Sequence, residues 1–237
     1  MKRGDCLIAR PMRLVPLLLL GVAADARIEA QSPPSWEIGL GGILGRPQGP
    51  AKEHLGSDAF GGAVEVGYRL RKAPLLLGIG FGTLDYSSFR WPPSPYVEFP
   101  PTTRAQTSFS HFVVRIQAAG GVVRPYVDAR LGINQPRATT TRWTGGIFGA
   151  SYHSEFQDTG LGYGGGAGLM IRFLNRLSKQ KGLRAASIDL GMHYLSGTDV
   201  RYIEQDSLHL DEDGLAFDLV TADPQMLTAG IGVRFEF

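Results

Sequence analysis

A histidine and a serine in the last quarter of the chain are the residues whose types could carry out nucleophilic catalysis. His193 and Ser196 lie three positions apart, and Asp199 or Glu204 could orient the histidine. A serine hydroxyl becomes a nucleophile when a histidine accepts its proton and an acid holds that histidine in place. On a β-strand, however, side chains three positions apart point to opposite faces. The spacing therefore argues against an enzyme and favours a histidine in a polar interior.

Three other motifs could indicate a ligand. Residues 160–165 (Gly-Leu-Gly-Tyr-Gly-Gly) satisfy a dinucleotide fingerprint, but residues 169–173 continue as a strand where that fingerprint requires a helix. Residues 211–214 (Asp-Glu-Asp-Gly) resemble the start of a calcium loop without its remaining ligands, so weak divalent binding is only an alternative to a solvated turn. A basic turn at 176–184 fits a solvated surface, because the chain's net charge is only +2. We expect no cofactor, no metal and no nucleic acid.

Charged residues that alternate with apolar ones form the main candidate site. They share the polar face of the predicted strands, and they are Glu37, Glu65, Arg69, Arg115, Asp128, Arg130, Arg172, Asp189 and Arg234. Unpaired charges inside a narrow barrel would be costly. We therefore expect a salt-bridge network that plugs the lumen, with an ion-selective pore as the alternative.

The sequence suggests specific partners within this network. If a turn centres on residues 121–122, Arg115 lies directly across from Asp128. A similar argument pairs Arg172 with Asp189. Closure of a barrel could bring Arg234 to Glu37.

The elements that must position these charges are strands, because apolar residues recur with a period of two. The last segment has Leu227, Ala229, Ile231, Val233 and Phe235 on one face and Thr228, Gly230, Gly232, Arg234 and Glu236 on the other. The pattern recurs in eight segments, which are 36–40, 64–71, 75–82, 111–118, 127–133, 161–173, 188–194 and 227–237.

The face opposite the apolar side chains is mostly glycine mixed with charges. This composition suits a narrow lumen better than a wet surface, whereas a soluble sheet would turn its large apolar side chains inward. A closed barrel in lipid satisfies every backbone group, so we expect the apolar face to point outward into a bilayer. A soluble periplasmic barrel that binds an apolar ligand is the alternative, and it requires the opposite orientation.

Joins between the predicted strands alternate in length. Those at 72–74, 120–124 and 175–184 are shorter, and those at 46–60, 87–105, 135–157 and 198–216 are long. Outer-membrane barrels have short periplasmic turns and long extracellular loops. Aromatic residues should mark both membrane interfaces: Trp36, Tyr68, Phe173, Phe235 and Phe237 at the periplasmic side, and Tyr86, Phe89, Trp91, Trp143 and Tyr202 at the outer side.

The N-terminus reads as a secretory signal, with basic residues before a short apolar run at 14–24. Cleavage is expected after Ala26, or alternatively after Ala30, which gives a signal peptide at 1–26 and a barrel domain at 27–237. A retained N-terminal anchor is the other interpretation. The one cysteine, Cys6, lies inside this segment, so the mature chain forms no internal disulfide.

Together, the signal, the alternating strands, the loop asymmetry and the final residues Gly-Val-Arg-Phe-Glu-Phe resemble the small outer-membrane barrels of the OmpA, OmpX and OmpW type. The fold expected is an all-β, eight-stranded, antiparallel, transmembrane up-and-down barrel. The resemblance implies that Phe235 and Phe237 belong to a C-terminal signal read by the barrel-assembly machinery. It also implies an outer-membrane location, with membrane lipid and lipopolysaccharide as partners.

We expect a monomer with a structural, surface-display or adhesive role and a lumen plugged by paired charges. Rigid strands would hold loops that carry recognition. An OmpW-like conduit for small hydrophobic molecules is one alternative, and it needs a cavity that opens sideways through the wall. A lipid-modifying barrel enzyme is an alternative of another class.

Overall fold

The computed structural model describes residues 35–50, 52, 57–71, 73–86, 88–90, 101–118, 120–143, 151–175, 182–203, 209–211, 214–216 and 218–237. Contacts divide the chain into residues 1–30 and residues 31–237. The first unit lies outside the described residues, as do the predicted signal peptide, both cleavage sites and Cys6.

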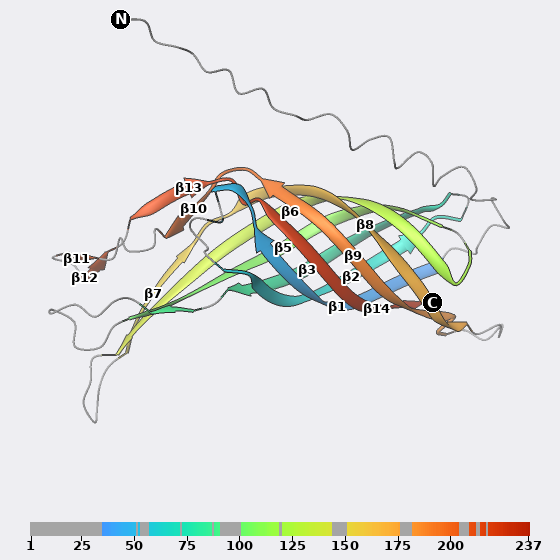
Figure 1. Ribbon diagram of the computed structural model, residues 1–237, viewed down its shortest axis with the longest axis horizontal. Helices are drawn as coiled ribbons and strands as arrows, with labels where there is room; N and C mark the ends of the chain where they lie inside the picture. The colour runs from blue at the N-terminus through green and yellow to red at the C-terminus, as the bar shows by residue number, and fades with distance from the viewer. Residues whose placement is uncertain are drawn as a thin grey trace, which may run out of the picture. The chain divides into compact units, whose positions relative to one another are not determined.

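Eight long strands close into an antiparallel barrel (Figure 1). Each pairs with its neighbour along the chain, and the first strand pairs with the last, which closes the sheet. The predicted fold class is therefore confirmed. The barrel strands are β1 (Ser35–Pro47), β2 (Ala59–Arg69), β3 (Leu75–Tyr86), β5 (Thr102–Gln117), β6 (Val123–Trp143), β8 (Gly160–Asn175), β9 (Ala185–Gly197) and β14 (Met226–Glu236).

Apolar side chains cover the outside of this barrel, as the period of two predicted. On β14, Ile231 is 63% exposed, whereas the nearby inward position Arg234 is 2% exposed. The same division holds for Leu77 and Leu76 on β3, of which the first is exposed and the second fully buried. Such a wide apolar exterior is the surface that a transmembrane barrel presents to lipid. The expectation that large apolar residues point away from the axis is confirmed.

Short connections gather at one end of the barrel, here called the turn end, and long ones at the other, the loop end. The turn end contains the connections 70–74, 118–122 and 176–184, and the loop end contains 48–58, 87–101, 144–159 and 198–225. In the turn 118–122, Gly121 has φ +95°, a conformation that glycine adopts without strain. The predicted alternation of short and long joins is confirmed.

Three of the predicted long joins have wrong bounds: strands continue into two of them, and the third is longer than predicted. β5 begins at Thr102, β6 runs to Trp143, and the short strands β4 (Phe89–Arg90) and β7 (Ser151–Gln157) extend the same sheet. The join predicted at 198–216 reaches residue 225 and contains two small hairpins. These are formed by β10 (Val200–Ile203) with β13 (Leu219–Ala222) and by β11 (His209–Asp211) with β12 (Gly214–Ala216).

The aromatic prediction holds at the turn end and is wrong for two of the five residues expected at the outer interface. Trp36 and Phe173 are exposed there, and Trp36 packs edge to face against Tyr68 with ring centroids 5.2 Å apart. Tyr86 and Tyr202 were expected at the outer interface, but both are buried. Tyr86 has the inward parity of Leu76 on the same strand, which explains the error. Trp91 and the side chains of Phe89 and Trp143 lie outside the described part. No helix among the described residues is long and apolar enough to span a membrane.

Candidate functional site

The polar interior of the barrel is the candidate site, and glycine at inward positions makes room for it. A Cβ on Gly39 would lie 3.2 Å from the Nη2 atom of Arg234, so the glycine leaves room for this guanidinium against the inner face of β1. A Cβ on Gly80 would lie 2.6 Å from the Nε2 atom of His111. Large polar side chains on some strands thus face residues without side chains on others.

Arg115 on β5 is the centre of the middle layer of charges. It lies directly across from Asp128 on β6, as expected from the short turn, and its Nη2 atom is 2.9 Å from Asp128 Oδ2. Its Nη1 atom is 3.0 Å from Glu65 Oε1 on β2, and its guanidinium lies 4.2 Å from the centre of the Tyr126 ring. Arg115 is completely buried. One guanidinium therefore holds three strands together across the lumen.

Arg234 on β14 joins the middle layer to the turn end. Its Nη2 atom is 2.9 Å from both Asp189 Oδ2 and Glu65 Oε1, and its Nη1 atom is 3.7 Å from Glu37 Oε2. The suggested contact of Arg234 with Glu37 is present, although the residue directly opposite on β1 is Gly39. The Tyr126 hydroxyl donates a hydrogen bond of 2.7 Å to Asp189. Asp189 is thus held from β6 and β14.

The predicted pairing of Arg172 with Asp189 is wrong. Asp189 lies opposite Met170, and Arg172 lies opposite Ser187, so the predicted register was displaced by two residues. Arg172 instead reaches Glu236 Oε2 at 3.5 Å. The connection 176–184 is too long for its sequence alone to fix which residues of β8 and β9 face each other.

A second layer of charges lies at the turn end. Arg124 on β6 and Arg69 on β2 both contact the carboxylate of Glu236, and Arg69 also bonds to Glu37. Gln117 donates a hydrogen bond of 2.9 Å to Glu37. Arg124 and Glu236 are not among the charges expected in the lumen, and Arg124 lies in the expected join 120–124, whereas β6 begins at Val123. Arg124 has the same inward parity as Asp128 on β6, and this parity would have identified it.

Arg130 lies between two histidines on the loop side of the middle layer. Its Nη1 atom is 3.2 Å from His111 Nε2, and its Nη2 atom is 2.8 Å from His193 Nε2. His193 also lies 3.3 Å from Asp128. A cavity of about 90 Å³ adjoins this cluster, and small residues of β1, β2 and β14 form its other wall.

The structure does not assemble the triad considered for catalysis. The Ser196 hydroxyl donates to Asp223 at 3.0 Å, whereas His193 contacts Arg130 and Asp128. Asp199 is exposed, and Glu204 lies outside the described residues. His193 is inward, as predicted, and it contacts the charges of the lumen.

Of the other sequence motifs, the structure tests the dinucleotide fingerprint directly. Residues 160–165 lie within the continuous strand β8, so the dinucleotide fingerprint lacks its helix. The described residues contain no group of three or more His, Cys, Asp or Glu side chains that could hold a metal ion. Residues 212–213 of the acidic turn and 176–181 of the basic turn lie outside the described ranges.

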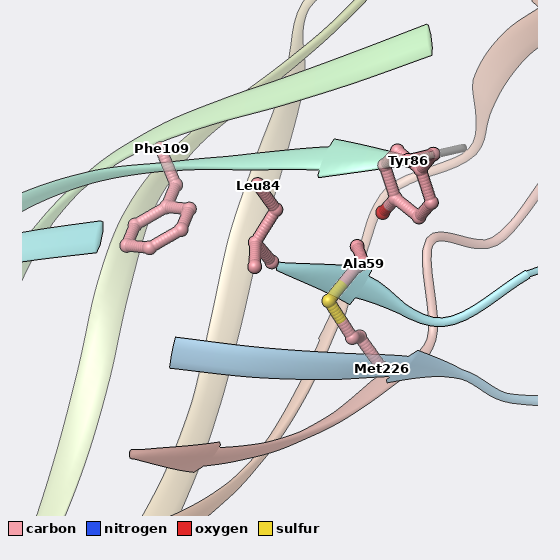
Figure 2. Packing of buried hydrophobic residues seen from close by; sticks show 5 residues of the cluster. All are labelled: Ala59, Leu84, Tyr86, Phe109 and Met226. Atoms are coloured by element: carbon pink, nitrogen blue, oxygen red, sulfur yellow. The ribbon is translucent and has the colours of Figure 1, made fainter. Parts of the chain in front are cut away.

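An apolar cluster lies on the inner side of the barrel towards the loop end (Figure 2). Its members come from four strands and are all buried: Ala59, Leu84, Tyr86, Phe109 and Met226. Ile43 and Ala105 pack against this group, which we call the apolar cap. A second cluster of Val200, Tyr202 and Ala222 forms where β10 pairs with β13.

An exposed ion pair fastens β10 to the loop that precedes β8. Asp158 accepts hydrogen bonds from the Arg201 backbone at 2.9 Å and from its guanidinium at 3.1 Å. These bonds, the side-chain bond foremost, lower the pKa of Asp158 below its ordinary value. The guanidinium also lies 5.5 Å from the centre of the Phe156 ring.

We expect this attachment to weaken in acid. A carboxyl group whose pKa is lowered by folding stabilises the folded form above its unfolded pKa of about 3.9, and that contribution disappears as the pH falls through the lower folded value. Backbone hydrogen exchange at Arg201, measured between neutral pH and the acid side of that range, should therefore accelerate beyond its intrinsic pH dependence. Asp158→Asn is the control, since it should remove this excess; the same excess in that variant would contradict the assignment.

Comparison with known proteins supports the fold. No protein-family model matches the chain, and no curated protein matches it by sequence. A major outer membrane protein from Thermus thermophilus is similar in structure, with a TM-score of 0.52 and 14% identity over 85% of this chain and 99% of that one. For Neisserial surface protein A the TM-score is 0.44 and the identity is 15%, over 88% of this chain and 100% of that one. For Ail of Yersinia pestis the TM-score is 0.40 and the identity is 16%, over 88% of this chain and 100% of that one.

The closed topology, the apolar exterior and the match to the Thermus protein agree with one another. At this level of identity the likeness concerns the fold and not the activity. The chain therefore has the eight-stranded antiparallel barrel fold of outer-membrane proteins.

Proposed function

We propose that the protein is an outer-membrane barrel that serves as a sealed anchor and displays its loop end at the cell surface, in a structural or adhesive role. The observation that supports this proposal is that buried side chains lie inside the lumen at two levels. The apolar cap occupies it near the loop end, and the charge layers around Arg115 and Glu236 occupy it towards the turn end. An eight-stranded barrel is narrow enough for side chains to fill.

The loop end supports display, because ordered structure continues beyond the apolar belt. On β5 the outward positions change from Phe112, Val114 and Ile116 to the polar residues Ser108 and Gln106. β6 continues to Trp143 and pairs with β7, and the β10–β13 hairpin adds a small buried cluster. Rigid strands that hold exposed loops are a common platform for recognition.

Location and partners are part of the same proposal. The exposed apolar exterior fits lipid, and the long connections fit the side that faces lipopolysaccharide. A secretory signal at 1–26 would export the chain, and Phe235 and Phe237 at the end of β14 would serve the barrel-assembly machinery. Phe237 is bound to the other edge of the seam, since its backbone N–H donates to Trp36 O at 2.9 Å. A closed barrel has no free edge in the membrane, which favours a monomer.

Conductance across a planar lipid bilayer tests the sealed lumen. The purified barrel should insert without producing stable channels, because the cap and the charge layers obstruct the path, and an open porin in the same bilayer provides the positive control. Stable, reproducible channels that scale with the amount of protein would refute the sealed anchor. They would favour the pore or the conduit for small hydrophobic molecules.

Epitope accessibility on intact cells tests the orientation. A tag placed between β11 and β12 should be labelled on intact cells, because the proposal puts the loop end outside. The same tag in the turn at 70–74 is the matched control and should be labelled only after the outer membrane is permeabilised. Labelling of the turn tag alone on intact cells would show that the proposed orientation is reversed.

A further inference from the structure

Charge is distributed unequally between the connections at the two ends of the barrel. The three connections at the turn end contain six Lys or Arg residues and no Asp or Glu. The four connections at the loop end contain thirteen Asp or Glu residues and three Lys or Arg residues. The six basic residues are Arg71, Lys72, Arg176, Lys179, Lys181 and Arg184. The turn end is therefore the end that attracts anionic partners.

The polar interior adds one positive charge at the same end. Among the described residues of the second layer, three guanidinium groups meet two carboxylates. They belong to Arg69, Arg124 and Arg172, and to Glu37 and Glu236. The middle layer is balanced, because its three guanidinium groups face three carboxylates. Charges in a protein interior are screened less than charges in water, so the surplus adds to the positive potential at the turn end.

Two of the basic residues flank Trp36 at the seam of the barrel. Trp36 on β1 lies opposite Tyr68 on β2, and Arg71 follows two residues beyond the end of β2. On the other side β1 pairs with β14, and the Arg184 backbone N–H donates a hydrogen bond of 2.7 Å to Glu236 O near the end of β14. Both arginines are exposed, and so is Trp36. The ends of four neighbouring strands, β2, β1, β14 and β9, thus carry an arginine on each side of an exposed tryptophan.

The depth of these arginines favours lipid over a soluble acidic partner. Tryptophan and tyrosine rings prefer the level of the headgroups in a membrane, and Trp36 packs against Tyr68. Arg71 and Arg184 lie at or beyond the level of this aromatic pair, where long basic side chains extend to the surface of a bilayer. A guanidinium group can bond a phosphate group through two N–H donors at once.

We propose that this part of the turn end, which we call the basic rim and define by Trp36, Arg71 and Arg184, binds anionic phospholipids in preference to zwitterionic ones. In a zwitterionic lipid the headgroup carries its own cation beside the phosphate, whereas in phosphatidylglycerol the arginines would supply it. The rim would hold the barrel at a fixed depth in the leaflet at its turn end. This inference rests on the proposed membrane location and is independent of what the loop end displays.

Quenching of Trp36 fluorescence by brominated lipids measures this preference. The chain contains three tryptophans, and Trp91→Phe with Trp143→Phe leaves Trp36 as the reporter beside the basic rim. The barrel is refolded into vesicles in which dibrominated phosphatidylglycerol or dibrominated phosphatidylcholine replaces part of the unbrominated lipid. We expect phosphatidylglycerol to bind beside Trp36 at least about threefold more tightly than phosphatidylcholine. This ratio should approach one at about 1 M salt, because ions screen charges at the membrane surface.

A variant of the basic rim and a matched control locate the effect. Arg71→Gln with Arg184→Gln removes two positive charges beside Trp36 and should bring the binding ratio close to one. Arg46→Gln with Arg137→Gln removes the same charge from exposed positions towards the loop end. Arg46 lies ten residues from Trp36 along β1, so this control should retain the preference.

The outcomes separate this inference from the proposed membrane location. Equal quenching by the two lipids, or a ratio that salt does not change, would overturn the inference. Loss of the preference in the Arg46 and Arg137 control would mean that net charge, and not the basic rim, selects the lipid. No quenching by either lipid would contradict the membrane location itself. The salt dependence with both rim arginines in place decides the matter even if the Arg71 and Arg184 variant does not fold.

Discussion

Arg115→Ala should destabilise the folded barrel by about 3–5 kcal/mol, the range for removing one partner of a buried ion pair. The loss is large because Arg115 is fully buried and forms ion pairs with both Asp128 and Glu65. Without it, both carboxylates would remain buried with one cation fewer to balance their charge. Equilibrium unfolding in urea, with the protein folded in lipid vesicles, measures the change. Arg104→Ala is the control, because the Arg104–Asp85 pair is solvent-exposed and should contribute at most about 1 kcal/mol.

A double-mutant cycle separates the interaction energy of Arg115 with Asp128 from the cost of leaving either side chain buried without its partner. Asp128→Ala alone leaves Arg115 with Glu65, and the double variant removes both members of the pair. We expect the double variant to lose less stability than the two single losses together, by about 0.5–3 kcal/mol. Strict additivity would show that Arg115 and Asp128 do not interact, and would remove the basis for the middle layer.

Ile231→Arg should destabilise the barrel in a bilayer by about 2–4 kcal/mol, the cost of an arginine at the midplane of a transmembrane barrel. Ile231 lies in the middle of the outward apolar run of β14, beside Leu190 on β9. A guanidinium at this position must be buried in hydrocarbon or distort the bilayer to reach water. Reversible unfolding from lipid vesicles gives the free energy directly.

The loss of stability should depend on how deep the substituted residue lies in the bilayer, and not on the exposed fraction of its side chain. Phe60 is 68% exposed, close to the 63% of Ile231, but it lies at the loop end of β2. Arginine near a membrane interface costs at most about 1 kcal/mol, so Phe60→Arg is the matched control. Equal losses for both variants would mean that the apolar exterior is not embedded in a bilayer.

The faces of the strands could be predicted because they depend on a local rule. With a period of two, the outward position of Ile231 and the inward position of Arg234 follow from neighbours along the same strand. The extensions of β5 and β6 towards the loop end could not be found in this way. Residues such as Ser108 and Gln135 carry no apolar alternation, because that part of the sheet lies beyond the apolar belt.

Partners across strands could be predicted only where a short turn fixes the register. Arg115 and Asp128 flank the turn at 118–122, and each lies where counting back from that turn places it. Arg172 and Asp189 flank a longer connection, and their pairing failed by two residues. Contacts that span several strands, such as those of Arg124 with Glu236 and of Arg130 with His193, depend on closure of the whole barrel. Sequence neighbours carry no direct information about them.

The seam between β1 and β14 has a consequence for how the chain folds. Glu37 lies directly opposite Glu236 there, so joining the first strand to the last brings two like charges together. Such a juxtaposition is unfavourable unless cations are already present, and Arg69 contacts both carboxylates. The edges of β1 and β14 therefore remain unpaired until β14, the last strand, has been synthesised and Arg69 on β2 lies close to both carboxylates. A truncated chain that lacks β14 would keep unpaired backbone N–H and C=O groups at its sheet edges, and it should aggregate instead of inserting into the membrane.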